Sequence, residues 1–121
     1  MTRIPIALVG VDHPHAEDWH RTLIAVPELA PVAHYDPHPS VASERLAPPY
    51  DELPVYGDLA ELLALHPVRA ALVMLPLEEA EDALLTLAGA GVHIMAEKPV
   101  ARTAQGLAPA VAALRPEAVF Y

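Results

Sequence analysis

Short apolar runs with strand-like composition alternate with segments of helical apolar spacing along all 121 residues of the chain. The strand-like runs lie at residues 4–9, 32–35, 69–75, 92–95 and 118–121. Strands that alternate with helices are typical of a parallel sheet whose two faces are both covered. We therefore predict an α/β fold, with a doubly wound parallel sheet in a single three-layer α/β/α domain.

The predicted helices are defined by apolar residues that recur at steps of three and four. Asp58 is the expected N-cap of a short helix, and Gly91 follows the end of a longer one. A further short helix is expected over residues 39–46. The inward-facing positions that we predict are Ala16, Trp19, Leu23 and Val26; Leu59, Leu62 and Leu63; Ala80, Ala83, Leu84, Leu87 and Ala88; and Leu107, Val111 and Leu114.

Composition removes several classes of function. The net charge of −9 opposes binding to a phosphate backbone or an anionic lipid surface, so we expect no nucleic-acid partner. The chain has no cysteine, which excludes disulfides and thiolate sites. Its apolar runs reach about eight residues, far below the roughly 20 that span a bilayer. We expect a cytoplasmic protein with no membrane partner.

The first candidate site combines Gly10, at the end of the first strand, with Asp36, at the end of the second. In dinucleotide-binding βαβ units the glycine allows a tight turn before a helix, and the acid binds the adenosine ribose. No arginine follows Asp36 closely, which favours NAD over NADP. The alternative for Asp36 is a purely structural turn over residues 37–40.

The segment after this glycine reads Gly10-Val11-Asp12-His13-Pro14-His15, where the dinucleotide fingerprint has G-x-G-x-x-G. Asp12 and His15 replace the second and third glycines, and both changes weaken a phosphate site. A protonated His13 or His15 would offset part of this loss. The alternative reading makes Asp12 the N-cap of the first helix, with Pro14 in its first turn.

A metal site is a further interpretation of this segment, because Asp12, His13, His15, Glu17 and His20 lie close together in sequence. Donors at such spacing often point apart, and the sequence offers no second cluster of similar density to complete a ligand shell. We therefore expect no metal.

The last candidate site is Glu97-Lys98-Pro99, which follows a buried strand. Ligands of open parallel sheets bind outside the carboxyl ends of the strands. Lys98 is the single lysine of the chain, and a lysine suits the polarisation or protonation of a substrate oxygen. The alternative is a structural Glu–Lys pair that ends the strand.

These motifs together resemble the N-terminal domain of the glucose-fructose oxidoreductase, inositol dehydrogenase and rhizopine catabolism (Gfo/Idh/MocA) family. The resemblance covers nearly the whole chain, and its most specific part is Ala90-Gly91-Val92-His93-Ile94-Met95-Ala96-Glu97-Lys98-Pro99. Other matching stretches are Ile6-Ala7-Leu8-Val9-Gly10, Tyr35-Asp36-Pro37, Ala71-Leu72-Val73 before Pro76, and Tyr56-Gly57-Asp58-Leu59 with Leu62-Leu63 after it.

The resemblance implies a Rossmann-like fold and a hydride transfer between NAD and a sugar, cyclitol or related alcohol. NADP is the less expected cofactor. Lys98 is the expected catalytic residue. The residues expected to bind the cofactor are Gly10, Asp12, His13, Asp36, Pro76, Glu97 and Lys98.

The sequence also departs from the family. A Thr-Pro-Asn segment with a histidine shortly after it is usual there, whereas this chain has Leu75-Pro76-Leu77 and Ala80. The alternative function is therefore a degenerate Rossmann module that binds no dinucleotide and serves as a small-ligand or protein-interaction domain.

Family members carry a second α/β domain that binds substrate and often forms homo-oligomers. Residues 1–121 correspond only to the NAD(P)-binding domain, so we expect a fragment of a longer oxidoreductase, with a stand-alone domain as the alternative. The chain alone would then be inactive, and a small-molecule substrate would bind to the intact enzyme. This account requires the turn at Gly10 and the Glu97-Lys98 pair to meet in one crevice.

Overall fold

The central sheet has five strands in the order β3-β2-β1-β4-β5, and every strand pair is parallel. The computed structural model describes residues 2–121. The strands are β1 (Ile4–Val9), β2 (Leu29–Tyr35), β3 (Val55–Tyr56), β4 (Ala70–Val73) and β5 (His93–Ala96). This topology confirms the predicted doubly wound parallel sheet.

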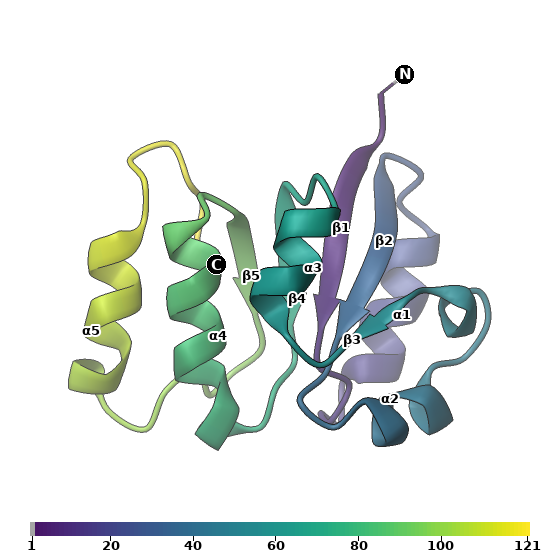
Figure 1. Ribbon diagram of the computed structural model, residues 1–121, viewed down its shortest axis with the longest axis horizontal. Helices are drawn as coiled ribbons and strands as arrows, with labels where there is room; N and C mark the ends of the chain where they lie inside the picture. The colour runs from purple at the N-terminus through teal and green to yellow at the C-terminus, as the bar shows by residue number, and fades with distance from the viewer. Residues whose placement is uncertain (1) are drawn as a thin grey trace.

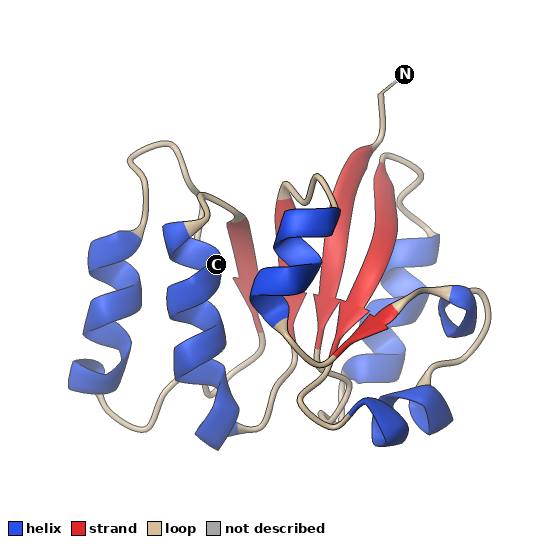
Figure 2. Ribbon diagram, in the orientation of Figure 1, coloured by secondary structure: helices blue, strands red, loops and turns tan. Residues whose placement is uncertain are grey.

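Helices cover both faces of the sheet. In Figure 1, α3 (Leu59–Leu65) and α4 (Leu77–Gly89) lie on the near side of the sheet, α5 (Ala104–Ala113) lies beside α4 at the left edge, and α1 (Ala16–Ile24) lies behind the strands. The helix α2 (Pro39–Arg45) and the 3₁₀ turn η1 (Tyr50–Glu52) pack on the α1 side. Figure 2 shows the resulting three layers, as predicted.

The strand β1 shows why both faces are covered. Ala7 and Val9 belong to the hydrophobic cluster under α3, α4 and α5, whereas Ile6 and Leu8 belong to the cluster under α1 and α2. Side chains of a strand alternate between faces, so a strand that is apolar at every position needs a helical layer on each side.

Local signals for helix ends behave as predicted at two places. The Asp58 carboxylate accepts hydrogen bonds from the N–H groups of Ala60 (2.9 Å) and Glu61 (3.2 Å), and so caps α3. Gly91 follows α4 with a φ of 73°, in the left-handed region where glycine ends helices most easily. All five predicted inward positions of α4 are buried.

Three details differ from the sequence predictions. The two-residue strand β3 and the turn η1 were not expected. On α5 the predicted inward residue Val111 is 53% exposed, and Ala110, at 1%, takes its place. Ala110 and Val111 lie three and four residues after Leu107, so both fit the helical spacing. The smaller side chain of Ala110 lets α5 approach α4 closely. At residues 118–121, Phe120 forms a single parallel bridge to Ile94 instead of a full strand.

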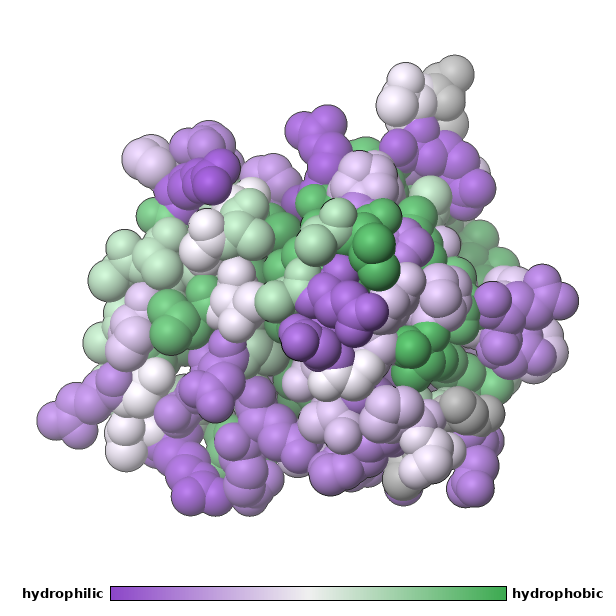
Figure 3. Space-filling view, viewed as in Figure 1, coloured by the Kyte–Doolittle hydropathy of each residue, from purple (hydrophilic) through white to green (hydrophobic). Residues whose placement is uncertain are grey.

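The carboxyl ends of the strands define one rim of the molecule. Gly10, Asp36, Met74 and Glu97 follow β1, β2, β4 and β5, so their segments all reach this rim. Side chains along the same edge are mostly hydrophilic in Figure 3. Among residues 2–121, no helix has the length and apolar character that crossing a membrane requires.

Candidate functional site

The turn after β1 and the segment after β5 are in direct contact at the rim. His15 Nδ1 lies 3.0 Å from Glu97 Oε1, and His13 Nε2 lies 3.3 Å from the carbonyl oxygen of Lys98. These residues are 82 or more positions apart in the sequence. The two candidate sites of the sequence therefore meet at one rim, and we call the region around this contact the predicted crevice.

Gly10 makes this crevice possible. Its φ is 86°, and a Cβ at this position would lie 2.6 Å from the carbonyl oxygen of Met74 and 2.7 Å from Leu75 Cδ2. A side chain would thus push the turn away from the segment after β4. The backbone is held there by the Gly10 N–H, which donates to the carbonyl of Tyr35 at 2.8 Å.

Glu97 is the centre of a hydrogen-bond network. Trp19 Nε1 donates to its Oε1 at 2.7 Å, and the Lys98 N–H donates to its Oε2 at 3.2 Å. The bond from Trp19, followed by that from His15, lowers the pKa of Glu97 below its ordinary value. Glu97 is thus an oriented carboxylate that joins α1 to β5.

The Asp12 side chain does not cap α1, which corrects one interpretation of the sequence. The N-cap is His15, without a side-chain cap, and Pro14 precedes it instead of lying in the first turn. Asp12 Oδ1 instead accepts from Arg45 Nη1 at 2.6 Å, across to α2. The Asp12 side chain thus pairs with Arg45 instead of capping α1, and the pair compensates the negative charge that Asp12 adds to the turn.

Asp36 lies at the end of β2, only 5% exposed. Its Oδ1 accepts from the His38 N–H at 2.8 Å, which is the turn bond of the structural alternative. The same turn fixes the carboxylate next to the end of β1, the position that a ribose-binding acid occupies in dinucleotide sites. The structural turn at Asp36 is thus present, and the binding of a ribose by the Asp36 carboxylate remains a prediction.

The remaining predicted residues also lie at the rim. Lys98 is exposed and precedes a cis bond to Pro99. Within the described part of the chain, its ammonium group makes no hydrogen bond or ion pair, and its catalytic role remains a prediction. Pro76 is the N-cap of α4, directly after the segment that follows β4.

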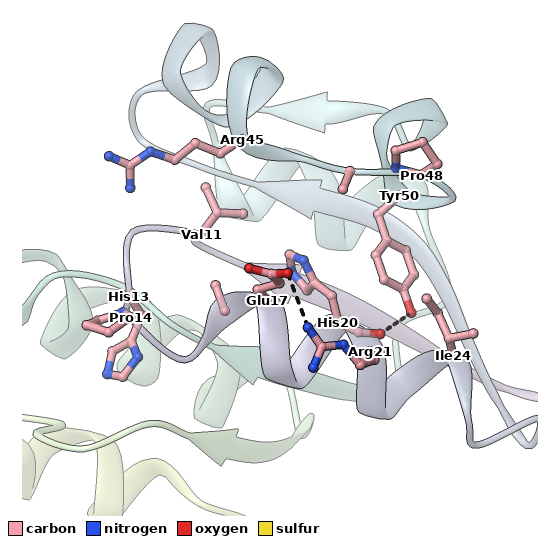
Figure 4. A pocket seen from close by; sticks show the side chains of 12 residues that line it. Val11, His13, Pro14, Glu17, His20, Arg21, Ile24, Arg45, Pro48 and Tyr50 are labelled. Carbon is pink, nitrogen blue, oxygen red and sulfur yellow. Dashed lines mark hydrogen bonds and ion pairs between the residues drawn. The ribbon is translucent and has the colours of Figure 1, made fainter.

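A cavity of about 510 Å³ opens on the outer side of α1. Figure 4 shows it between α1 and the segment from Arg45 to Tyr50, with Glu17 bound to Arg21 and Tyr50 donating to the carbonyl of His20. Of the predicted cofactor-binding residues, only His13 lines it. This cavity is therefore beside the predicted crevice and is not the crevice itself.

Sequence reasoning missed two members of the site. Trp19 was assigned to an apolar stripe, and its indole N–H turns out to bind Glu97. Arg45 was not considered, although it compensates Asp12. The signal available for Trp19 was its place one helical turn after His15, which puts both side chains on the same face of α1.

The sequence matches over residues 4–120 the family described as an oxidoreductase family with an NAD-binding Rossmann fold, Gfo/Idh/MocA. The chain belongs to this family. The match covers both the turn at Gly10 and the Glu97-Lys98-Pro99 motif, so the resemblance stated from the residues is confirmed. No protein of curated function matches the sequence.

Solved structures similar to this Gfo/Idh/MocA domain include several dehydrogenases. One from Chromobacterium violaceum is 23% identical with a TM-score of 0.80, over 93% of this chain and 33% of that chain. A myo-inositol 2-dehydrogenase from Lactobacillus plantarum is 17% identical with a TM-score of 0.80, over 98% of this chain and 35% of that chain.

A third structure is the WlbA dehydrogenase from Chromobacterium violaceum in complex with NADH and UDP-GlcNAcA. It is 21% identical with a TM-score of 0.75, over 93% of this chain and 32% of that chain. Identities this low establish the shared fold. The chain spans about a third of the length of the structures that it matches.

Proposed function

We propose that this chain is the NAD-binding domain of an oxidoreductase that acts on a sugar, a cyclitol or a related alcohol. The observation that carries the proposal is the contact between the Gly10 turn and the Glu97-Lys98 segment. It brings a phosphate-type turn and a free lysine to one crevice at the carboxyl ends of parallel strands. The WlbA and myo-inositol enzymes named above support the cofactor and the substrate class.

The residues of the crevice fit a dinucleotide. Gly10 leaves space that a Cβ would fill, and α1 begins without a side-chain cap on the N–H groups of its first turn. Asp36 supplies a carboxylate for the ribose. Arg45 holds the carboxylate of Asp12, which otherwise opposes a pyrophosphate.

The bound NAD would supply the hydride acceptor or donor. Lys98 would then approach the substrate oxygen, where its ammonium group stabilises developing negative charge or delivers a proton. Glu97 orients this segment, because its carboxylate accepts from the N–H of Lys98 and is anchored by Trp19. In this proposal the substrate and oligomerisation surfaces belong to a further domain.

Calorimetric titration of the chain with NADH, NAD⁺, NADPH and NADP⁺ tests the proposal. We expect saturable binding that favours the NAD forms and is lost in Asp36→Ala, with a smaller effect in Lys98→Ala. Glu44→Ala, on the exposed part of α2, is the matched control and should bind as the unchanged chain does. No heat at millimolar cofactor would reject the proposal.

A degenerate Rossmann module is the second candidate, and the segment after Gly10 is the observation in its favour. Asp12 and His15 occupy glycine positions of the fingerprint, and Glu17 and Asp18 add negative charge to the first turn of α1. The same titration separates the two candidates, because a degenerate module binds none of the four cofactors.

A further inference from the structure

His13, His15 and Glu97 form a cluster at the mouth of the crevice. One nitrogen from each imidazole and one carboxylate oxygen all lie within 4.8 Å of one another. Ligand atoms of a tetrahedral zinc site are roughly 3.3 Å apart, given bonds of about 2.0–2.1 Å. His15 Nδ1 lies 3.0 Å from Glu97 Oε1 and His13 Nε2 lies 3.9 Å from Glu97 Oε2, so each imidazole faces its own carboxylate oxygen at a distance close to that value. We propose that these three residues bind a zinc-class divalent cation.

The donor set selects the class of metal. Two imidazoles and one carboxylate suit Zn²⁺, Co²⁺ or Ni²⁺, whereas Mg²⁺ and Ca²⁺ require mainly oxygen ligands. The side chains of His13 and Glu97 are 15% and 12% exposed, and that of His15 is 50% exposed. The cluster is therefore supported by protein on one side and open on the other, which leaves a fourth position for an exogenous ligand.

Hydrogen bonds from neighbouring groups orient the Glu97 carboxylate. Trp19 Nε1 binds Glu97 Oε1 at 2.7 Å, and the Lys98 N–H binds Oε2 at 3.2 Å. Such outer hydrogen bonds orient the ligands of metal sites and commonly change metal affinity by about 10–100-fold when removed. Glu97 thus needs little reorganisation to accept a cation, which would replace its direct contact with His15 Nδ1.

Binding through His13 Nε2 gives up two hydrogen bonds, and one of them provides a test. His13 Nδ1 now accepts from the His15 N–H at 3.0 Å, so the neutral ring carries its proton on Nε2, which lies 3.3 Å from the Lys98 carbonyl oxygen. A metal at Nε2 requires that proton to move to Nδ1, which releases both the His15 N–H and the Lys98 carbonyl to other partners. Coordination of the metal replaces these two hydrogen bonds, each of which contributes little net stability.

The proposal is independent of NAD binding, and its test contains no cofactor. The tag-free chain is treated with chelator and titrated calorimetrically with ZnCl₂, and Co²⁺ is added separately to record d–d absorption. We expect one ion per chain and the spectrum of a four-coordinate Co²⁺ centre. His15→Ala and Glu97→Gln should each weaken binding by about 100-fold or more.

His38→Ala is the matched control, because His38 and Glu79 form an ion pair at 3.0 Å without a second histidine. It should bind zinc as the unchanged chain does. Circular dichroism checks that each variant is folded. In an amide NMR spectrum the His15 signal should shift on zinc addition, because its acceptor is lost.

Weak binding with no defined stoichiometry would overturn the proposal and leave the cluster as an ion pair between α1 and β5. So would equal affinity in folded Glu97→Gln, or an unchanged His15 amide signal at saturating zinc.

Discussion

Trp19 donates a hydrogen bond of 2.7 Å from its indole nitrogen to Glu97 Oε1, and this contact joins α1 to the segment that carries Lys98. It is the first cause of the lowered pKa of Glu97. Trp19→Phe keeps an aromatic ring but removes the donor. We expect the pKa of Glu97 to rise toward its ordinary value and the free energy of unfolding to fall by about 1 kcal/mol. NMR titration of the Glu97 carboxyl carbon and urea unfolding measure the two effects. An unchanged Glu97 titration would show that the indole bond is absent in solution.

The buried side chain of His34 should make the stability of the protein depend on pH. Its side chain in β2 is fully buried, and burial lowers its pKa from 6.5 to about 4, against smaller opposing contributions from the charge of Asp36 and the backbone of Gly10. The unfolded chain therefore binds a proton at higher pH than the folded one, and stability falls as pH decreases from about 6.5 to about 4. The full loss is roughly 3 kcal/mol, and it levels off below the folded pKa.

Urea unfolding between pH 8 and pH 3 measures this loss. His34→Leu should remove most of the slope, because leucine carries no titrating group at this buried position. The remaining slope should include His20, whose pKa burial also lowers. His38→Ala, at an exposed site, should keep the slope. An equal slope in folded His34→Leu would contradict the assignment.

Gly10 and Gly89 predict opposite results for the same substitution. Gly10→Ala places a Cβ 2.6 Å from the Met74 carbonyl at a φ of 86°, so we expect a loss of about 2 kcal/mol or more. Gly89 lies at the end of α4, with no atom within 4 Å of an added Cβ. Gly89→Ala should leave stability unchanged or raise it by up to about 1 kcal/mol. Urea unfolding compares the two, and equal losses would show that the Gly10 turn is not constrained as described.

Asp12→Gly is predicted to strengthen NADH binding. The change restores the second glycine of the fingerprint, removes a negative charge and frees Arg45, which now binds Asp12 at 2.6 Å. We expect affinity to rise about three- to tenfold, equivalent to roughly 0.7–1.4 kcal/mol. Arg45→Ala should weaken binding, because it leaves the Asp12 charge uncompensated. Calorimetry measures both variants, and tighter binding in Arg45→Ala would contradict this role for the ion pair.

The sheet and most helices could be predicted because they depend on local patterns. The apolar run of β1, the Asp58 cap and the stripe of α4 each signal their structure within a few residues. The two-residue strand β3 could not be predicted in this way, because its pairing with β2 depends on the packing of α2 and η1. On α5, periodicity alone could not separate Val111 from Ala110.

The site was predicted less completely than the fold. Gly10, Asp36 and Lys98 were predicted as site residues because they follow strand ends, and parallel strands bring such positions to one rim. Asp12 was given the wrong structural role as a cap, because Arg45 is 33 residues away and no local rule signals their pairing. The contacts of Glu97 with His13 and His15 join segments that follow β5 and β1, two strands that β4 separates in the sheet, and no local pattern in the sequence signals such a contact.

The measurement that tests the central claim most directly is energy transfer from Trp19 to NADH. Trp19 is the single tryptophan of the chain, and it contacts Glu97 at the crevice. Excitation of the indole should produce nicotinamide emission that saturates at one NADH per chain and disappears in Asp36→Ala. The absence of both sensitised emission and Trp19 quenching at millimolar NADH, after inner-filter correction, would contradict the NAD-binding function.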